Sequence, residues 1–396
     1  MRKIRNLMFA GIAAVSLTAC AGGAGTQETA ETQEASAAET QEASAAETQE
    51  ASAAETQEAS AAETQEVSVV GDTAGSYTVT DVRGEKITFD AEPQRVVTVG
   101  KPFPSIYYAI EGATDNIVGC NPSSIKAYEE SVLRFMYPQL ENAATDWCNT
   151  DSTVNLEELL KLQPDVVFIY STDEQEIEKM ESAGLKVVAL RSAELDSVKE
   201  NLQIMAAVCQ EEERGEELVR LIDEQIAEVT SRLDGVAEED KPSVIEFYSD
   251  MNVSVSKYDH WMIPSGAHNP ASGLTGQMTE VDMEQILLWN PEIIYIGNHS
   301  DLMPSDLLEN KQEGRDWSVV SAVANKQVYK IPIGAYRWDP AGVETPLMVK
   351  WAAKIQYPEI FADMDMEQEV KDFFEIVYQY ELTDEQVSEI LDNRQQ

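Results

Sequence analysis

A helix–turn–strand unit occurs twice in this sequence, and the two copies align without a gap. They span residues 155–169 and 282–296. In each copy apolar residues recur at helical spacing, and a proline (Pro164 or Pro291) then prevents the helix from continuing. A short β-branched and aromatic run follows, which is typical of a buried strand in a parallel sheet. The duplication therefore favours a chain with two similar α/β lobes.

The first turn of each repeated helix carries a glutamate at the same position. Asn155 and Asp282 can cap the two helices, which places Glu157 and Glu284 where a negative charge interacts favourably with the helix dipole. That interaction contributes only about 0.3–1 kcal/mol per residue. The repeat thus predicts a carboxylate at the same place on each lobe.

The N-terminus has the pattern of an export signal. Three basic residues precede an apolar run over residues 7–17, which is too short to span a membrane comfortably. The run ends in Leu17-Thr18-Ala19-Cys20, which resembles a bacterial lipobox. We expect residues 1–20 to be a lipoprotein signal peptide with Cys20 as the lipidated residue. The alternative is a simple signal peptide with an incidental cysteine.

Residues 21–75 are predicted to form a disordered acidic stalk. The segment Glu-Thr-Gln-Glu-Ala-Ser-Ala-Ala recurs along it from residue 31 onward. Without large apolar residues this segment cannot bury a core, and its glutamates repel one another. The repetition is therefore that of a tether and not that of a solenoid.

The formal net charge of −44 at pH 7 excludes some partners. Nucleic acid would be repelled by such a surface. Anionic lipid would be repelled as well, so contact with the membrane is expected through the lipid anchor only.

The cysteines predict no zinc site, because neither CxxC nor Cys/His zinc spacing is present. Cys120 ends a predicted strand and Cys148 lies in the loop before the first repeated helix. They could form a disulfide outside the cytoplasm, or remain two buried thiols. Cys209 follows a helical apolar pattern and is predicted to lie in the core.

The rest of the chain divides into three parts. Strands and helices alternate over 76–211, which predicts an N-terminal α/β lobe with a parallel sheet. A proline-free helical pattern over 212–235 predicts one long helix between the lobes, and 236–396 forms the C-terminal α/β lobe with closing helices. The expected fold is therefore α/β, with two three-layer lobes joined by a rigid helix and a ligand cleft between them.

The body resembles the class III solute-binding proteins of ABC importers for iron-siderophores, haem, cobalamin and related metal complexes. The resemblance covers nearly all of residues 78–392. It rests on both repeats and on further short motifs in the family's order: Arg95-Val96-Val97, Asp316-Trp317-Ser318-Val319-Val320, Val328-Tyr329, Trp351-Ala352-Ala353-Lys354 and Tyr357-Pro358-Glu359. It implies two lobes joined by one long helix and a protein that binds without catalysing a reaction.

The resemblance also implies the partners. In that family a glutamate on each lobe docks onto arginines of the membrane permease, and Glu157 and Glu284 fall on those positions. Glu158 and Glu280 are near neighbours that could serve instead. We expect a monomer that meets an ABC permease with its ATPase, has no intrinsic cofactor and carries a metal chelate as transported ligand. Export and lipidation would place it on the outer face of the cytoplasmic membrane.

Ligands of open α/β sheets bind at the carboxyl ends of the strands, which selects particular loops here. The aromatic side chains among them would suit a large, flat or aryl-bearing chelate. The predicted ligand contacts are Lys101, Phe103, Asn121, Trp147 and Ser171 in the first lobe, and Tyr248, Tyr258, His260, Trp261, Tyr336, Arg337 and Trp338 in the second.

Several of these residues have an equally reasonable structural explanation. Arg337 could clamp a carboxylate, catecholate or oxyanion, or it could form an ordinary surface ion pair. Trp261 and Trp338 could be packing residues. His260 is a weak candidate to complete a metal's coordination shell, whereas His268 and His299 have the character of loop histidines. No dedicated site for a bare ion is expected.

The leading functional hypothesis is capture of a ferric siderophore for import. Cobalamin, haem and molybdate or tungstate are the alternatives, and an oxyanion would favour Arg337 and backbone donors over aromatic stacking. An extracellular enzyme is more distant, because the sequence has no GxSxG elbow, HExxH motif or P-loop. A surface adhesin or scaffold would explain the stalk but not the repeated glutamates.

Overall fold

The computed structural model describes residues 70–71, 75–192, 194–255 and 259–391. All of them belong to one compact unit, residues 64–396. The predicted signal peptide with Cys20 and nearly all of the predicted stalk lie outside the described residues. Two residues of the predicted stalk range, Val70 and Gly71, form a strand (β1) that pairs antiparallel with β2, Tyr77–Thr80. The folded body therefore begins before residue 76.

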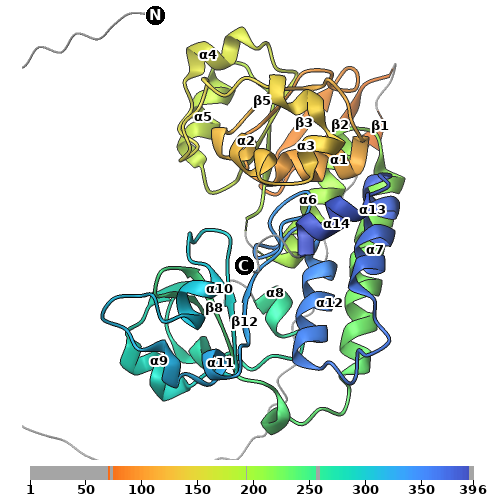
Figure 1. The fold of residues 1–396 in the computed structure, drawn as a ribbon. Helices are drawn as coiled ribbons and strands as arrows, with labels where there is room; N and C mark the ends of the chain where they lie inside the picture. The colour runs from red at the N-terminus through yellow and green to blue at the C-terminus, as the bar shows by residue number, and fades with distance from the viewer. Residues whose placement is uncertain (1–69, 72–74, 193, 256–258, 392–396) are drawn as a thin grey trace, which may run out of the picture. The chain divides into compact units, whose positions relative to one another are not determined.

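The first lobe is built on a small antiparallel sheet and a parallel one (Figure 1). The antiparallel sheet has the order β1-β2-β3, where β3 is Lys86–Phe89. The parallel sheet has the order β5-β4-β6-β7, with β4 at Val96–Thr98, β5 at Ile117–Cys120, β6 at Val166–Tyr170 and β7 at Val187–Leu190. Its strands are nearly continuous apolar runs because helices cover both faces of the sheet.

Within the described residues, this lobe has six α-helices. They are α1 (Phe103–Glu111), α2 (Pro122–Glu129), α3 (Leu133–Met136), α4 (Leu156–Lys161), α5 (Glu174–Ser182) and α6 (Leu195–Val208). A 3-10 helix, η1, covers Pro138–Asn142.

One long helix, α7, follows the first lobe and covers Glu212–Arg232. Its 21 residues correspond to a rod of about 30 Å. Gly215 lets α7 approach α6 closely, because a Cβ at this position would lie 2.7 Å from the Cβ of Ala206. Most of the length of α7 is therefore held by packing and cannot act as a loose linker.

The second lobe has a five-stranded mixed sheet in the order β10-β9-β8-β11-β12. The strands are β8 (Val244–Ser249), β9 (Asn252–Ser254), β10 (Met278–Glu280), β11 (Ile293–Ile296) and β12 (Val328–Lys330). β8, β11 and β12 are parallel, whereas β9 and β10 form an antiparallel edge. Its helices are α8 (Asp259–Met262), α9 (Met283–Trp289), α10 (Pro304–Leu308) and α11 (Ser321–Ala324), with 3-10 helices η2 (Glu238–Asp240), η3 (Pro270–Gly273) and η4 (Trp317–Val319).

The three C-terminal helices pack partly against the first lobe, which the sequence did not predict. They are α12 (Thr345–Gln356), α13 (Met366–Tyr378) and α14 (Asp384–Leu391). α12 packs along α7, and α13 contacts both α12 and α1 (Figure 1). The rings of Tyr108 and Tyr378 lie 5.8 Å apart, and Arg134 forms an ion pair with Glu389. The chain thus returns to its first lobe before it ends.

The duplicated unit is a structural repeat as well as a sequence repeat. Asn155 and Asp282 each accept a hydrogen bond from the backbone N–H three residues later, as helix caps do. Each helix is then followed by a residue in the left-handed region, Gln163 with φ 48° and Asn290 with φ 43°. The strands β6 and β11 follow at the same distance. The prediction of one unit used twice is confirmed.

None of the helices in the described ranges is long and apolar enough to cross a membrane.

Candidate functional site

Two adjoining pockets lie where loops of the first and second lobes meet. They measure about 490 Å³ and about 410 Å³ and share Lys101, His299 and Tyr336. We refer to them together as the cleft. The larger pocket is lined from the first lobe by Lys101, Ser123, Lys126 and Glu130, and from the second by Asn298, His299, Ser300, Asp301, Met303, Lys330, Tyr336 and Arg337. The smaller one includes Tyr170, Asp173, Tyr248 and Gln277.

Arg337 is held in the cleft from both lobes. Its Nη2 donates to the Glu130 carboxylate of the first lobe at 3.4 Å, and its Nη1 lies 3.1 Å from Nδ1 of His299. The same Nη1 lies 3.4 Å from Nε2 of His299, and because a guanidinium can only donate, the imidazole is the acceptor in this contact. Arg337 Nε is buried and has no hydrogen-bond partner within the described ranges. The guanidinium therefore keeps one donor that the described residues do not satisfy.

His299 is fixed by the loop that follows β11. Its ring stacks on Tyr248, with centroids 4.6 Å apart and an interplanar angle of 29°. The buried Lys330 directs its ammonium onto the loop carbonyls of Gly297 and Ser300, at 3.0 Å and 2.6 Å. Asn298 donates to the buried Asp339 at 2.9 Å. The ammonium of Lys330 therefore holds the backbone of this loop in place through its carbonyl groups.

The loop that carries Tyr336 and Arg337 is anchored by a buried glutamate. Glu344 accepts hydrogen bonds from the backbone N–H groups of Ala335 (3.2 Å) and Tyr336 (3.1 Å). It also accepts from Nε1 of Trp338 (2.6 Å) and from the hydroxyl of Tyr378 (2.9 Å). Burial raises the pKa of Glu344 to about 7, and the four donated hydrogen bonds oppose that rise. Sequence reasoning missed this residue.

The larger pocket of the cleft carries a local excess of cationic groups in an acidic protein, whereas the smaller pocket adds the carboxylates of Asp151 and Asp173. Lys101, Lys126 and Arg337 face Glu130 and Asp301, and Lys101 and Lys126 are exposed. Burial raises the pKa values of the phenols of Tyr170, Tyr248 and Tyr336, so these side chains are neutral at physiological pH. The larger pocket is thus suited to an anionic group, and the tyrosines of the smaller pocket are suited to apolar or aromatic parts of the same ligand.

Four of the predicted ligand contacts line the cleft, namely Lys101, Tyr248, Tyr336 and Arg337. The others in the first lobe have structural roles. Phe103 is buried with its ring 4.8 Å from that of Tyr170. Asn121 is buried and caps α2 by accepting from the backbone N–H of Ser123 at 2.8 Å. Ser171 donates its backbone N–H to Leu190. Tyr258 lies outside the described residues.

The predicted contacts Trp147, Trp261 and Trp338 are corrected by their burial. Their exposed fractions are 0%, 0% and 1%. Nε1 of Trp147 donates to the carbonyl of Ala144, and the Trp261 ring meets Tyr295 edge-on at 5.3 Å. Each indole fills a core instead of the cleft, because a large apolar ring stabilises the fold most when it is removed from water.

The histidine assignments are also corrected. His299 lines both pockets, whereas the lining of the cleft does not include His260. His268 is half exposed and lies 3.8 Å from Glu238. The carboxyl-end rule points to Asn298 and His299 when it is applied to β11, which ends at Ile296. Within the described part of the chain, no group of three or more His, Cys, Asp or Glu side chains is arranged to hold a metal ion.

The three described cysteines are free thiols in buried positions. Of the two states that the sequence left open for Cys120 and Cys148, the structure has the unbridged one. Burial raises the pKa of each thiol to about 12, so both are inert as nucleophiles. Cys209 lies in the core.

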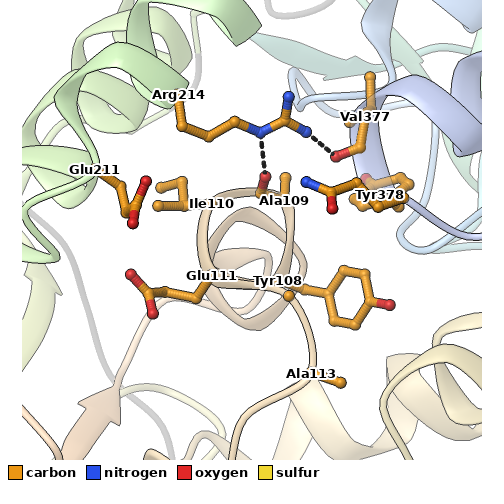
Figure 2. A pocket seen from close by; sticks show the side chains of 11 residues that line it. Tyr108, Ala109, Ile110, Glu111, Ala113, Glu211, Arg214, Val377 and Tyr378 are labelled. Atoms are coloured by element: carbon orange, nitrogen blue, oxygen red, sulfur yellow. Dashed lines mark hydrogen bonds between the residues drawn. The ribbon is translucent and has the colours of Figure 1, made fainter.

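A further pocket of about 400 Å³ lies where α1, α7 and α13 meet (Figure 2). Arg214 of α7 donates through Nε to the carbonyl of Ala109 at 3.1 Å and through Nη2 to that of Val377 at 2.6 Å. Arginine at these helix ends satisfies carbonyls that have no partner within the helix. We call this arrangement the Arg214 brace.

Burial, with a contribution from Glu92, raises the pKa of the nearby Glu111 to about 7.

The raised pKa values of Glu344 and Glu111 predict that the protein is more stable in mild acid. Between pH 4.5 and 7 the folded state binds protons that the unfolded state has released, so stability rises as the pH falls through this range. For the fully buried Glu344, lowering the pH from 7.5 to 5.5 should add about 2 kcal/mol. Thermal unfolding at both pH values checks this, and an equal or lower melting temperature at pH 5.5 would contradict it. Glu344→Gln should flatten the dependence.

Residues 96–333 match the family described as periplasmic binding protein. The chain belongs to this family, and is a solute-binding component of an ABC importer that works outside the cytoplasm with a membrane permease.

Individual relatives differ in what they bind. A periplasmic solute-binding protein of Veillonella parvula is 31% identical, with a TM-score of 0.75, and the match covers 80% of this chain and 97% of that one. The molybdate-binding protein MolA of Haemophilus influenzae is 27% identical over 326 residues, which are 76% of this chain and 90% of that protein. Nickel-bound CeuE of Helicobacter pylori, 23% identical with a TM-score of 0.65 over 79% of this chain and 99% of that one, shares the fold.

Proposed function

We propose that the cleft captures an anionic metal complex, with a ferric siderophore as the first candidate, and that the protein delivers it to the permease. The observation that carries the proposal is Arg337, which bridges the lobes and keeps one buried donor without a partner. The adjoining Tyr170, Tyr248 and Tyr336 supply aromatic walls. Pockets of about 300–1,000 Å³ are typical of sites for small-molecule ligands, and each half of the cleft lies in this range.

Molybdate or tungstate is the second candidate. The similarity to the molybdate-binding protein of Haemophilus influenzae favours it, as does the group of donors formed by Arg337, Lys101 and Lys126. A tetrahedral oxyanion would use the guanidinium and ammonium groups and would need little of the aromatic wall. Haem and cobalamin have no comparable support from the donors in the cleft.

Docking is proposed to use Glu157 and Glu284. Both lie in the first turn of the repeated helices, and the Glu157 side chain is 85% exposed. Glu158 is less suitable because it forms a 2.7 Å ion pair with Lys161. An exposed carboxylate on each lobe can set the register of a partner that presents arginines.

Attachment to the membrane is proposed to occur through a lipid on Cys20, after export and removal of residues 1–19. The support for this is the basic, apolar and small-residue pattern that ends in Leu17-Thr18-Ala19-Cys20.

The proposed ligand class is tested by titrating candidate ligands into the wild-type protein and into the Arg337→Ala variant. We expect a ferric siderophore to bind, and loss of charge-assisted hydrogen bonds worth about 1.5–3 kcal/mol to weaken it by roughly 10–150-fold. Isothermal titration calorimetry with ferric catecholate and hydroxamate siderophores, molybdate and tungstate provides the measurement.

The matched control is Arg315→Ala, which removes an arginine paired with Asp250 elsewhere on the second lobe at 2.6 Å. It should leave ligand affinity unchanged. Binding of molybdate or tungstate without any siderophore would select the second candidate. If none of the metal complexes binds, the proposed ligand class is wrong.

A further inference from the structure

The two repeated helices expose matching surfaces beyond the glutamates. Leu160 on α4 and Leu287 on α9 each follow the glutamate by three residues, and both are 43% exposed. Residues three apart on a helix are neighbours on its surface. Each lobe therefore presents a carboxylate beside an apolar side chain.

The two surfaces differ at the next position. In the first lobe this position is Lys161, whose Nζ lies 3.8 Å from the carboxylate of Glu157. In the second lobe it is Leu288, which is 78% exposed, the highest value among the exposed large apolar side chains of the described residues. Glu284 forms no ion pair with any residue that the structure describes. One carboxylate is thus partly compensated by a cation and the other is flanked by two leucines.

We propose that the two lobes dock with unequal strength, and that the second-lobe surface, formed by Glu284, Leu287 and Leu288, dominates binding of the permease. The proposal rests on the docking role proposed above for the glutamates. An arginine that approaches Glu157 must compete with Lys161 and is repelled by its charge. An arginine that approaches Glu284 meets no such cation, and the contact also removes exposed leucine surface from water.

The negative charge of the two surfaces favours the permease as their binding partner. A second copy of this chain would bring another acidic surface, from a protein of net charge −44, against the glutamates. An anionic membrane would be repelled in the same way. A partner that presents a cation next to an apolar side chain complements both surfaces, and permeases are the partners of this family.

The unequal surfaces also suggest an order of events. The second lobe makes contact first and remains bound longer, and the first lobe adds a weaker contact that completes the register. The first-lobe contact should then be the one that is readily broken when the permease changes conformation.

The test measures binding of the full-length protein to the permease–ATPase complex of its importer, reconstituted in nanodiscs of neutral phosphatidylcholine. We expect Glu284→Ala to weaken binding several-fold more than Glu157→Ala. Leu288→Lys, which copies the first lobe, should weaken binding about tenfold, and Lys161→Leu, which copies the second, should strengthen it. Glu157→Ala should become more damaging when Lys161→Leu is also present.

Ile376→Lys is the matched control, because Ile376 is a 46% exposed apolar residue on α13, away from both surfaces. Binding by this variant should equal that of the wild type, and the melting temperatures of all variants should agree. If Leu288→Lys unfolds, Leu288→Ser replaces it.

If the two glutamate variants lose the same amount of affinity for the permease–ATPase complex while Lys161→Leu and Leu288→Lys change nothing, the proposed inequality is overturned and the docking role stays intact. Wild-type binding by the double variant Glu157→Ala with Glu284→Ala would instead reject the docking role itself. Sedimentation of the wild type and of Leu288→Lys tests for self-association. A dimer that forms in the wild type and is lost in the variant would show that a second copy of the chain covers this surface, and would overturn the proposal.

Discussion

Import should fall to background when Glu157 and Glu284 are both replaced by alanine, while the isolated protein keeps its affinity for ligand. The two side chains lie on α4 and α9 and are absent from the lining of the cleft. Loss of both carboxylates removes the charge-assisted contacts that are proposed to set the register on the permease. Uptake of radiolabelled ligand by cells that carry the variant, together with calorimetry on the purified protein, measures both effects.

A matched double variant separates docking from a general effect of charge. Glu367 and Glu385 are exposed and lie in the first turns of α13 and α14, so they share the helix-dipole role without lying on α4 or α9. Glu367→Ala with Glu385→Ala should import normally. If ligand affinity is lost in the Glu157 and Glu284 variant, these residues have a role other than docking.

Glu344→Ala should destabilise the protein by roughly 3–5 kcal/mol, the largest effect on stability expected here. The change leaves four donors without their acceptor: the backbone N–H groups of Ala335 and Tyr336, Nε1 of Trp338 and the hydroxyl of Tyr378. Three of the four hydrogen bonds are buried and that of Tyr336 is partly buried, so solvent replaces few of the lost acceptors.

Urea unfolding followed by tryptophan fluorescence measures this change. Glu344→Gln retains one acceptor oxygen and should lose about half as much, because two of the four donors keep a partner. The glutamine variant should also bind ligand more weakly, since the loop carrying Arg337 is held by the same carboxylate. A loss below about 1 kcal/mol for the alanine variant would show that the network is dispensable.

The duplicated unit could be predicted because its determinants are local. A capping side chain at Asn155 or Asp282, helical spacing, and a proline after the helix are all contained within fifteen residues of sequence. These features act through the backbone of the same segment and do not depend on distant packing. The same holds for α7, whose pattern is uninterrupted by proline.

The three tryptophans could not be assigned correctly because burial is a property of the assembled fold. An indole after a strand is compatible with a ligand cleft or with a core, and the difference is decided by residues far away in sequence. Trp261 meets Tyr295, and Trp338 reaches Glu344. The role of Glu344 itself depends on Tyr378, which is 34 positions further along the chain.

His299 was within reach of sequence reasoning. The rule that ligands gather at the carboxyl ends of strands applies to β11 as it does to its neighbours, and Arg337 was selected by it correctly for the cleft. What the sequence could not supply is the pairing of Arg337 with Glu130 across the cleft, since these residues are 207 positions apart.

The Arg214 brace has a consequence for how the protein competes for the permease. Because Arg214 ties the N-terminal end of α7 to the ends of α1 and α13, and α12 packs along α7, bending of α7 would break contacts with the helices beside it. The spacing between Glu157 and Glu284 should therefore be nearly the same with and without cargo. A permease that recognises this spacing alone would bind the ligand-free protein as readily as the ligand-bound protein. In a cell with more binding protein than ligand, the ligand-free protein would then compete for the permease and slow import.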